Sequence, residues 1–505
     1  MPGPDLNVTD PVFEWAGRTP YETAIIECDR VVDYRTLCTA VLRAMAAFRE
    51  AGWQPGQVIA VSLQGDAALQ LVVSLALARA GLAQVWLPLG DPLEYRTARA
   101  QALRVAAVVT DDEQGALKSI AHLAPDPGWL ATSGTAPVPP DLRVNGAGRA
   151  MILIQSSGTT GVPKDIVVSH DEEMLFADRF KPLFACLPGE RFMNLTAVRF
   201  WTGLTRALRC LSTGGTFIVP PATWTPEELL QCIELHHVTY FACAPMHMRL
   251  LLDGIGGDAP RLPGLRILRC SSAALPVSVL QEVRRRISPN LYVNYGANEA
   301  GGITAAPPAL LDRYPDCAGF PLEGIDLEIV DENDRPVAAG ELGQVRIRGA
   351  GIGPRRMLGA APEAAPAFKG DWYYPGDIGV RNAEGVVFLK GRSDEVMNFD
   401  GIMVGPAEIE SVLSRHPAVA EAAAFPLPSP LHQDIPAVAV VLRYYVPIEE
   451  LTLYCKQHLG IRAPREFVLI DAIPRSPIGK ILRRRLTELA VARINAGTAP
   501  ARDAG

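Results

Sequence analysis

The chain is 505 residues long, with 20% charged residues and a formal net charge of -7. This length exceeds what one hydrophobic core organises, so we expect two or more domains. The acidic balance gives no basic field for nucleic acid and no cationic face for a membrane, and we expect neither as a partner. Nine cysteines without CxxC or Cys/His ligand spacing indicate free thiols in a reducing compartment, which predicts a cytoplasmic protein.

Helix and strand patterns alternate through the first 300 residues. Apolar positions at helical spacing begin at Tyr34 and stop at Gly52, and a short buried strand is expected at 58–62. A helix over 67–80, a strand over 83–87, a helix from 95 and a strand over 105–110 follow. An apolar segment at 151–154 leads into a glycine-rich turn. A second set of strands is then expected at 217–219, 240–243, 266–270 and 292–294, with a helix over 226–237. Such alternation predicts parallel sheets in an α/β fold.

The pattern changes after residue 325. Short alternating strands with turn residues between them predict an antiparallel sheet or small barrel over 325–349. A charged turn at 391–394 begins a last unit of roughly 110 residues, which is large enough for a small domain. We predict disorder after about residue 495.

A glycine- and hydroxyl-rich turn follows the strand expected at 151–154. It reads Gln-Ser-Ser-Gly-Thr-Thr-Gly-Val-Pro-Lys over residues 155–164. Glycines let backbone N–H groups approach phosphate oxygens, hydroxyls add donors and the lysine adds a positive charge. The turn therefore favours a polyphosphate ligand.

This segment resembles the phosphate loop of the adenylate-forming superfamily, which includes acyl-CoA synthetases, peptide-synthetase adenylation domains and luciferases. It differs from the P-loop of motors and kinases. Further motifs similar to those of the family follow in order across nearly the whole chain, and the acyl-CoA synthetase branch fits best. The resemblance implies phosphate binding by Ser156, Ser157, Gly158, Thr159, Thr160, Gly161 and Lys164.

Three other segments resemble the nucleotide-binding motifs of the family, and they lie at 270–275, 294–299 and 374–377. The resemblance implies that Tyr295 stacks on adenine, that Glu299 holds Mg²⁺ and acts in catalysis with Asn298, and that Asp377 binds the ribose hydroxyls. The implied adenine- and ribose-binding residues are Ser272, Ala273, Ala274, Asn294, Tyr295, Gly296, Asp377 and Arg392.

Two C-terminal segments resemble family motifs that take part in domain rotation. Residues 391–394 resemble the hinge block, and residues 474–480 resemble the loop that inserts a lysine into the active site. They imply a large N-terminal domain over 1–392, with two α/β sheet subdomains and a small β-barrel, and a small mobile α+β C-terminal domain over 393–505. Asp394 is the implied hinge, Lys480 the lysine inserted for adenylation, and Gly401 a residue of the CoA channel. A Gly401→Leu substitution is therefore expected to block thioester formation and spare adenylation.

The family resemblance implies an acyl-CoA ligase that makes a thioester through an acyl-AMP, using ATP, Mg²⁺ and coenzyme A. The implied acyl-pocket residues are apolar or small, and they are Phe200, Trp201, Gly203, Ser271, Ala297, Gly301 and Gly302. They favour a bulky apolar acid, aromatic or polycyclic, over acetate. Arg199 lies near enough to these positions that an acid with a second carboxylate is left open. Coenzyme A is preferred to a carrier protein, because no segment resembles a carrier module.

Several positions depart from the family pattern. Asp165 replaces a glycine and Asn298 a threonine near the phosphates, Ser272 replaces another glycine, Pro375 replaces a threonine, and Asn398 and Asp400 stand where lysines are common. Repulsion by Asp165 would weaken triphosphate binding, which suggests an alternative enzyme that only thioesterifies an acyl-adenylate supplied by a separate adenylating enzyme. A non-catalytic acyl-nucleotide binder and a luciferase-like oxygenase are further alternatives. A homodimer is left open.

Overall fold

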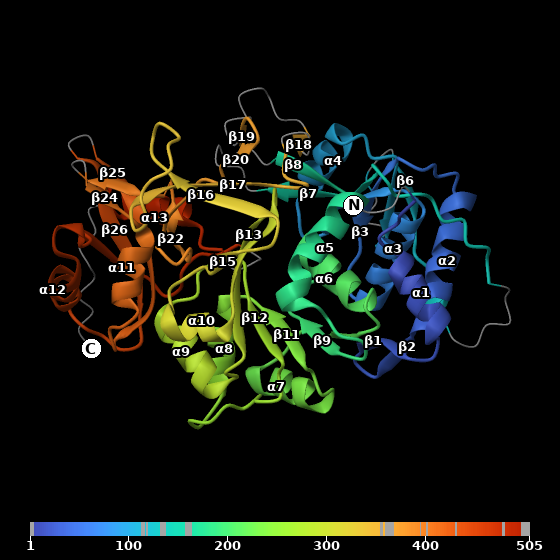
Figure 1. Cartoon of the computed structure of the whole chain (residues 1–505), viewed down its shortest axis with the longest axis horizontal. Helices are drawn as coiled ribbons and strands as arrows, with labels where there is room; N and C mark the ends of the chain where they lie inside the picture. Colours follow the sequence, from blue (N-terminus) through green and yellow to red (C-terminus); the bar gives the residue numbers. More distant parts are fainter. Residues whose placement is uncertain are drawn as a thin grey trace.

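The computed structural model describes residues 5–112, 117, 120–131, 138–156, 164–353, 357–358, 368–393, 395–399, 402–429, 432–476 and 480–495. A large N-terminal domain and a small C-terminal domain lie side by side, with the C-terminal elements at the left of Figure 1. The prediction of an α/β large domain followed by a small α+β domain is confirmed.

A mixed seven-stranded sheet forms the first layer of the large domain. Its strands, in spatial order, are β18 (Met357–Leu358), β8 (Lys164–Ser169), β7 (Ala150–Ser156), β4 (Ala83–Trp86), β3 (Val58–Ser62), β5 (Ala107–Thr110) and β6 (Ala121–Leu123). The strands from β7 to β6 run parallel, and β8 and β18 add antiparallel edges. The helical segments in this part of the chain are α1 (Asp10–Arg18), α2 (Tyr34–Glu50), α3 (Ala67–Arg79), α4 (Leu93–Ala102) and the 3₁₀ turn η2 (Pro127–Leu130).

Helix α3 is apolar all round because it lies between two sheets. It contacts β4 in the first sheet and β1 in the second, and its residues from Ala68 to Arg79 are buried. The buried guanidinium of Arg79 is paired with Asp141 at 2.5 Å and with Asp10 at 3.2 Å. The first two sheets therefore share one core.

The second sheet of the large domain has nine strands. In order they are β15 (Phe320–Pro321), β14 (Gly301–Ala306), β13 (Leu291–Ala297), β12 (Ile267–Cys270), β11 (Tyr240–Cys243), β9 (Arg191–Asn194), β10 (Thr216–Val219), β1 (Thr23–Glu27) and β2 (Arg30–Asp33). The strands from β13 to β1 are parallel. The helices of this part are α5 (His170–Phe184), α6 (Trp201–Leu211), α7 (Pro226–Leu235), α8 (Pro245–Gly254), α9 (Val277–Arg286) and α10 (Pro308–Arg313).

A third, antiparallel sheet ends the large domain. It contains β16 (Ile325–Val330), β17 (Leu342–Gly349), β19 (Phe368–Lys369), β20 (Trp372–Tyr373), β21 (Asp377–Arg381) and β22 (Val387–Arg392). The antiparallel pairing of β16 with β17 confirms the sheet expected over 325–349. β22 ends at Arg392, which is where we place the domain boundary; that boundary stays a prediction.

The small domain folds around its own sheet. It contains β23 (Met397–Phe399), β24 (Ile402–Val404), β25 (Val419–Ser429), β26 (Gln433–Leu442) and β27 (Glu466–Leu469), with α11 (Pro406–Leu413), α12 (Ile448–Leu459), the 3₁₀ turn η5 (Gly460–Arg462) and α13 (Arg483–Asn495). Separate apolar clusters lie on the two faces of the β25–β26 ladder. The tail predicted to be disordered lies outside the described residues beyond Asn495.

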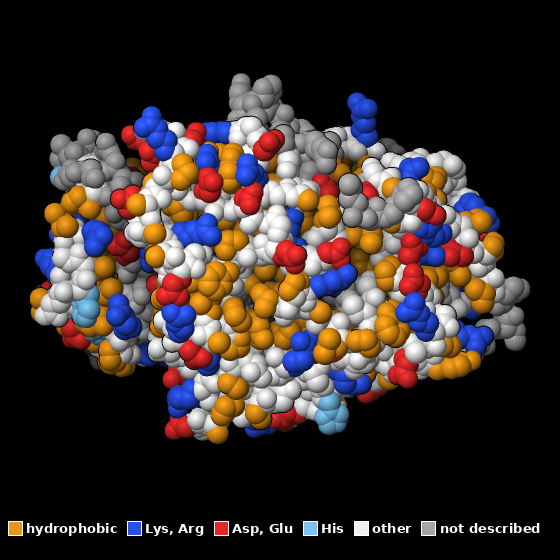
Figure 2. Space-filling model, in the orientation of Figure 1, with side chains coloured by type: hydrophobic (Ala, Val, Ile, Leu, Met, Phe, Trp, Pro, Cys, Tyr) orange, Lys and Arg blue, Asp and Glu red, His pale blue; other side chains and the backbone are white. Residues whose placement is uncertain are grey.

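The outer surface carries charges of both signs. Figure 2 shows Lys and Arg side chains interspersed with Asp and Glu over the face that it presents. Within the described part of the chain, no helix is long and apolar enough to cross a membrane. All nine cysteines are free thiols, and seven of them are buried, as expected for small apolar residues.

Candidate functional site

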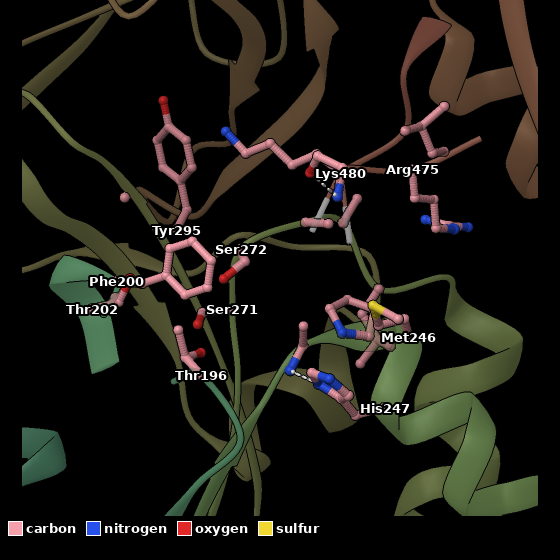
Figure 3. A pocket seen from close by; sticks show the side chains of 18 of the residues that line it. Thr196, Phe200, Thr202, Met246, His247, Ser271, Ser272, Tyr295, Arg475 and Lys480 are labelled. Atoms are coloured by element: carbon pink, nitrogen blue, oxygen red, sulfur yellow. Dashed lines mark hydrogen bonds between the residues drawn. The ribbon is translucent and has the colours of Figure 1, made fainter. Parts of the chain in front are cut away.

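A cleft of about 2700 Å³ lies between the two domains and reaches into the large one. The carboxyl ends of the parallel strands β9, β11, β12 and β13 open into it, which is the usual position for a ligand in an open α/β sheet. Figure 3 shows side chains from these strand ends facing Lys480, which the small domain contributes. Both domains therefore provide side chains to one site.

Tyr295 and Asp377 line this cleft and contact each other. The Tyr295 hydroxyl donates to Asp377 Oδ2, and Arg392 Nη1 lies 3.7 Å from Asp377 Oδ1. Burial raises the pKa of Asp377, while the hydrogen bond from Tyr295 and the positive charges of Arg392 and Lys480 act in the opposite direction. Burial and the charge of Asp377 raise the pKa of Tyr295, so the phenol keeps its proton. The structure thus gathers three of the predicted adenine- and ribose-binding residues, with the predicted catalytic lysine close to them.

Glu299 and Asn298 follow β13 on the same wall. The hydroxyl of Tyr373 is hydrogen-bonded to Glu299, and burial together with this carboxylate raises the pKa of Tyr373. Asn298 Nδ2 donates to the backbone carbonyl of Gln155 at 3.3 Å. That contact places Asn298 beside the strand that leads into the phosphate loop.

The two strands that carry the phosphate loop form a hairpin. β7 and β8 pair antiparallel, with Ser156 opposite Lys164 at the open end. The predicted binding residues Ser157, Gly158, Thr159, Thr160 and Gly161 lie outside the described residues, as do the side chains of Ser156 and Lys164. Asp394 and Gly401, predicted as hinge and CoA-channel residues, also lie outside them.

Asp165, one of the departures from the family pattern, is ion-paired. Its Oδ1 accepts a hydrogen bond from Arg99 Nη2 at 2.6 Å, and both side chains are mostly buried. Arg99 comes from α4, the polar helix expected from residue 95. A neutralising partner thus offsets the negative charge that suggested repulsion of the triphosphate.

Ser272 occupies a backbone conformation that favours glycine. Its φ angle is +82°, in the left-handed region, at the end of β12. This explains why the family usually has glycine here. Ser272, Ala273, Ala274, Asn294 and Gly296 all line the cleft, as the family resemblance implied.

The predicted acyl-pocket residues are only partly brought together. Phe200, Trp201, Ser271, Ala297, Gly301 and Gly302 line the cleft, whereas Gly203 does not. A Cβ on Gly203 would lie 2.0 Å from the carbonyl oxygen of Ala197, and one on Gly302 would lie 2.2 Å from Phe180 Cζ. Close packing of neighbouring atoms requires glycine at both positions, so these glycines are not evidence of room for substrate.

Sequence reasoning missed two buried arginines beside this pocket. Arg206 on α6 and Arg269 on β12 both line the cleft and are 5% and 4% exposed. Arg206 lies among the apolar Leu204 and Ala207 on one face of α6, and no motif in the sequence marks it as a functional residue. Only the packing of α6 against the strand ends reveals that this face is buried.

Comparison with known proteins agrees with this geometry. A family model described as AMP-binding enzyme matches residues 12–355, and one described as AMP-binding enzyme C-terminal domain matches residues 408–480. The chain belongs to the AMP-binding enzyme family. This confirms the family resemblance found in its motifs.

Relatives within the AMP-binding enzyme family are CoA ligases. A sulfoacetate–CoA ligase of Cupriavidus necator is 29% identical over 346 residues, or 66% of each chain. An indoleacetate–CoA ligase of Aromatoleum aromaticum is 27% identical over 513 residues, covering 94% of this chain and 97% of the relative. The prediction of an AMP-forming acid–CoA ligase is confirmed at the level of the family.

The fold also matches solved structures. An o-succinylbenzoate CoA synthetase from Bacillus subtilis, in complex with the acyl-adenylate intermediate OSB-AMP, superposes with a TM-score of 0.83. It is 22% identical, and the match covers 94% of this chain and 97% of that one. This likeness shows the shared two-domain fold.

Proposed function

We propose that this protein activates a carboxylic acid with ATP to form an acyl-AMP and then transfers the acyl group to coenzyme A. The observation that carries the proposal is that Lys480 of the small domain and Asp377 of the large domain face one cleft, close enough for the lysine charge to favour ionisation of the carboxyl. A cation there can offset the charge that develops when the acid attacks the α-phosphate.

The nucleotide would lie along the wall made by β13 and the turn before β21. Asp377 would accept hydrogen bonds from the ribose hydroxyls, which are donors suited to a carboxylate. Asn298, which is held near the phosphate hairpin by its contact with Gln155, would donate to a phosphate oxygen. Arg392 Nη1 donates to the Pro375 carbonyl at 2.5 Å, which fixes the guanidinium beside the ribose site.

Magnesium fits this site through a single carboxylate. Mg²⁺ is usually held by one or two carboxylates together with phosphate oxygens and waters. Glu299 lines the cleft beside Asn298 and would hold the ion, whose charge would neutralise the departing pyrophosphate. Among the described residues no cluster of three His, Cys, Asp or Glu side chains forms a protein-only metal site, and ATP-bound magnesium does not need one.

The acid would have a bulky apolar body. Half-buried Phe200 and Trp201, together with Phe180, present aromatic surface to the cleft. Aromatic rings contribute large apolar contact area, which favours an aromatic or polycyclic acid over acetate. The support comes from these rings and not from the tightly packed glycines.

A complete two-step reaction is favoured over thioesterification of a preformed acyl-adenylate. The latter hypothesis rested on two departures near the phosphates, Asp165 and Asn298. Arg99 neutralises Asp165, and the amide of Asn298 keeps a hydrogen-bond donor near the phosphate hairpin. Lys480 also reaches the cleft, and that residue serves only the adenylation step in this mechanism. A separate adenylating enzyme is therefore not required.

The test combines two assays. ATP–pyrophosphate exchange with a panel of aromatic and aliphatic acids measures adenylation, and thioester formation from synthetic acyl-adenylates and CoA measures the second step. We expect both activities with the same acyl group, and we expect Lys480→Ala to lose exchange while retaining thioester formation. Absence of exchange with every acid, with thioester formation intact, would support the thioesterification-only enzyme. Absence of both would favour a non-catalytic nucleotide binder.

A further inference from the structure

Arg206 lies deep in the wall of the cleft with only neutral hydrogen-bond partners. Its Nη1 donates to Asn194 Oδ1 at 3.0 Å and its Nη2 to Ser271 Oγ at 2.7 Å. Asn194 is 1% exposed and Ser271 is 6% exposed, so water offers little further solvation. The guanidinium is thus held in place without a counter-charge.

Positive charge is in excess around Arg206. Arg269 donates from Nε to Asn294 Oδ1 at 2.6 Å and packs against the rings of Phe180 and Phe184, which are again neutral partners. Arg209, on the same helix as Arg206, is paired with Glu173 at 2.5 Å. Over the part of the chain that the structure describes, no carboxylate contacts Arg206 or Arg269, so this cluster carries two uncompensated positive charges.

Such an arrangement is costly in the absence of a ligand. Removing a cation from water is strongly unfavourable unless an anion is placed beside it. Burial, with the repulsion of Arg269 added to it, lowers the pKa of Arg206 to about 9. A protein that needed only packing at this position would gain by an apolar residue, so the charge indicates a function.

The donors of this cluster can reach the contents of the cleft. Arg206, Ser271 and Trp201 all line it. Because Ser271 Oγ accepts from Arg206, its own proton is free to be donated to a ligand. Trp201 Nε1 is buried and, among the described residues, has no hydrogen-bond partner. Figure 3 shows Ser271 between Thr196 and Ser272 on the wall below Tyr295.

We infer that the acid carries a second anionic oxygen group, such as a carboxylate or sulfonate, which binds to Arg206 and Ser271 in the wall of the acyl pocket. This inference rests on the proposed function and deepens it. An aromatic or other apolar body would contact Phe200 and Trp201, and the second anion would neutralise the buried guanidinium. The charge-assisted hydrogen bonds from arginine are strong and directional, which makes this group a determinant of specificity.

The experiment compares acids that share a carbon skeleton. The pairs are phenylacetate with 4-carboxyphenylacetate, benzoate with isophthalate, and hexanoate with adipate, each measured by pyrophosphate exchange. For at least one pair we expect wild-type kcat/KM to favour the dianion, and Arg206→Met to lower kcat/KM for that dianion about 10- to 100-fold, as for hydrogen bonds to a charged group. The monoanion should change by less than about threefold.

Two further variants separate contact from general charge. Arg206→Lys keeps the charge but loses the fork of donors, and we expect an intermediate loss for the dianion. Arg199→Met removes an exposed arginine of the same cleft, and we expect it to retain the preference for the dianion. Loss of the preference in Arg199→Met and not in Arg206→Met would overturn the inference.

Thermal unfolding provides a readout that does not depend on catalysis. Without ATP, the preferred dianion should raise the wild-type melting temperature more than its monoanion does, and this difference should vanish in Arg206→Met. The inference is wrong if wild type prefers monoanions in every pair, or if Arg206→Met affects both members equally, because Arg206 would then serve the reacting carboxylate. Lack of turnover combined with a selective melting shift would contradict the proposed function and leave the anion site supported.

Discussion

Arg99 Nη2 lies 2.6 Å from Asp165 Oδ1, so an ion pair joins helix α4 to the strand that leaves the phosphate loop. The two side chains are 10% and 17% exposed, which limits screening by solvent. The carboxylate that replaces the family glycine has therefore been accommodated together with a cation. This pairing makes Asp165 a tolerated feature of an ATP-binding loop and no longer a reason to expect loss of adenylation.

Removal of Arg99 should leave the carboxylate of Asp165 without its neutralising partner and weaken ATP binding. In Arg99→Met we expect the KM for ATP to rise about fivefold, which corresponds to roughly 1 kcal/mol for a partly buried ion pair. Thioester formation from a synthetic acyl-adenylate should be unaffected, because that step binds no triphosphate. Pyrophosphate exchange at varied ATP concentration measures the KM for ATP. The double variant Arg99→Met/Asp165→Asn should recover the wild-type KM, and failure to recover would mean that Arg99 contacts ATP directly.

The sequence predicted those parts of the site that depend on local patterns. The strands at Val58–Ser62 and Tyr240–Cys243 followed from short apolar segments. The strand expected at 292–294 lies within β13 (Leu291–Ala297), whose carboxyl end carries Tyr295. Asp377 and Lys480 were assigned by resemblance of their motifs, and the structure brings both to the cleft. Local pattern and motif order were sufficient because each residue stands at a fixed offset from a strand end or turn.

Long-range packing determines what the sequence could not show. Asp165 looked unpaired because its partner, Arg99, lies 66 positions earlier on a helix that reads as solvated. Gly302 looked like an opening for substrate, yet Phe180 fills that space. Such contacts join elements whose separation in sequence carries no signal in the pattern of either one.

Glu421 links the two domains in the observed arrangement. On β25 of the small domain, its carboxylate lies 2.7 Å from Arg249 Nη1 of α8 and 3.1 Å from Arg475 Nη2. Burial opposes ionisation of Glu421, but the two arginines outweigh it and lower the pKa of this carboxyl. Because Arg249 belongs to the large domain, a rotation of the small domain, as the family resemblance implies, would break the pair with Arg249.

We therefore expect Glu421→Gln to slow adenylation selectively. The rate of pyrophosphate exchange should fall about three- to tenfold, since the arrangement that places Lys480 in the cleft loses a partly buried ion pair. Thioester formation from acyl-AMP should be unchanged or faster. Glu384→Gln, which breaks an exposed ion pair with Arg313 inside the large domain, is the matched control and should change neither rate. Equal slowing of both steps by Glu421→Gln would argue against a conformational role.

Nucleotide binding should depend on the ionisation of Asp377. Burial raises the pKa of this carboxyl above its ordinary value, and only the ionised form offers acceptors to both ribose hydroxyls. AMP affinity should then be full at neutral pH and fall as the pH decreases through the raised pKa. Isothermal titration calorimetry at several pH values measures this, and Asp377→Asn should bind AMP weakly with no such dependence. An equal pH dependence in the variant would assign it to another group.

Ser272 should be a site where substitution by glycine stabilises the protein. Its φ angle of +82° costs a residue with a side chain about 1 kcal/mol, whereas glycine adopts it freely. Ser272→Gly should therefore raise the free energy of unfolding by about 1 kcal/mol in a urea titration. Gly340→Ala is the opposite control, because Gly340 has φ +92° with open space around it, and we expect a loss of similar size. A destabilising Ser272→Gly would show that the hydroxyl makes a compensating interaction.

His170 should make the large domain sensitive to acid. It begins α5, is fully buried, and accepts the backbone N–H of Val8 at Nδ1 over 3.3 Å. Burial lowers the pKa of His170 to about 4, from an ordinary value of 6.5. The unfolded chain thus binds a proton between about pH 6.5 and pH 4 that the native state does not, so stability is complete above pH 6.5 and is lost as the pH falls. The full difference is on the order of 3 kcal/mol.

Substitution of His170 by asparagine should remove this loss. The Asn Oδ1 can accept from the Val8 N–H as the imidazole Nδ1 does, so the variant keeps this hydrogen bond. At pH 7.5 His170→Asn should still unfold at a lower urea concentration than wild type, because volume is lost in a packed site. Between pH 6.5 and 4.5, however, the unfolding free energy of the variant should decline less steeply than that of wild type. The exposed His122→Asn serves as the control and should reproduce the wild-type slope. If His170→Asn and wild type declined in parallel, other titrating groups would account for the acid sensitivity, and the buried imidazole would have no part in it.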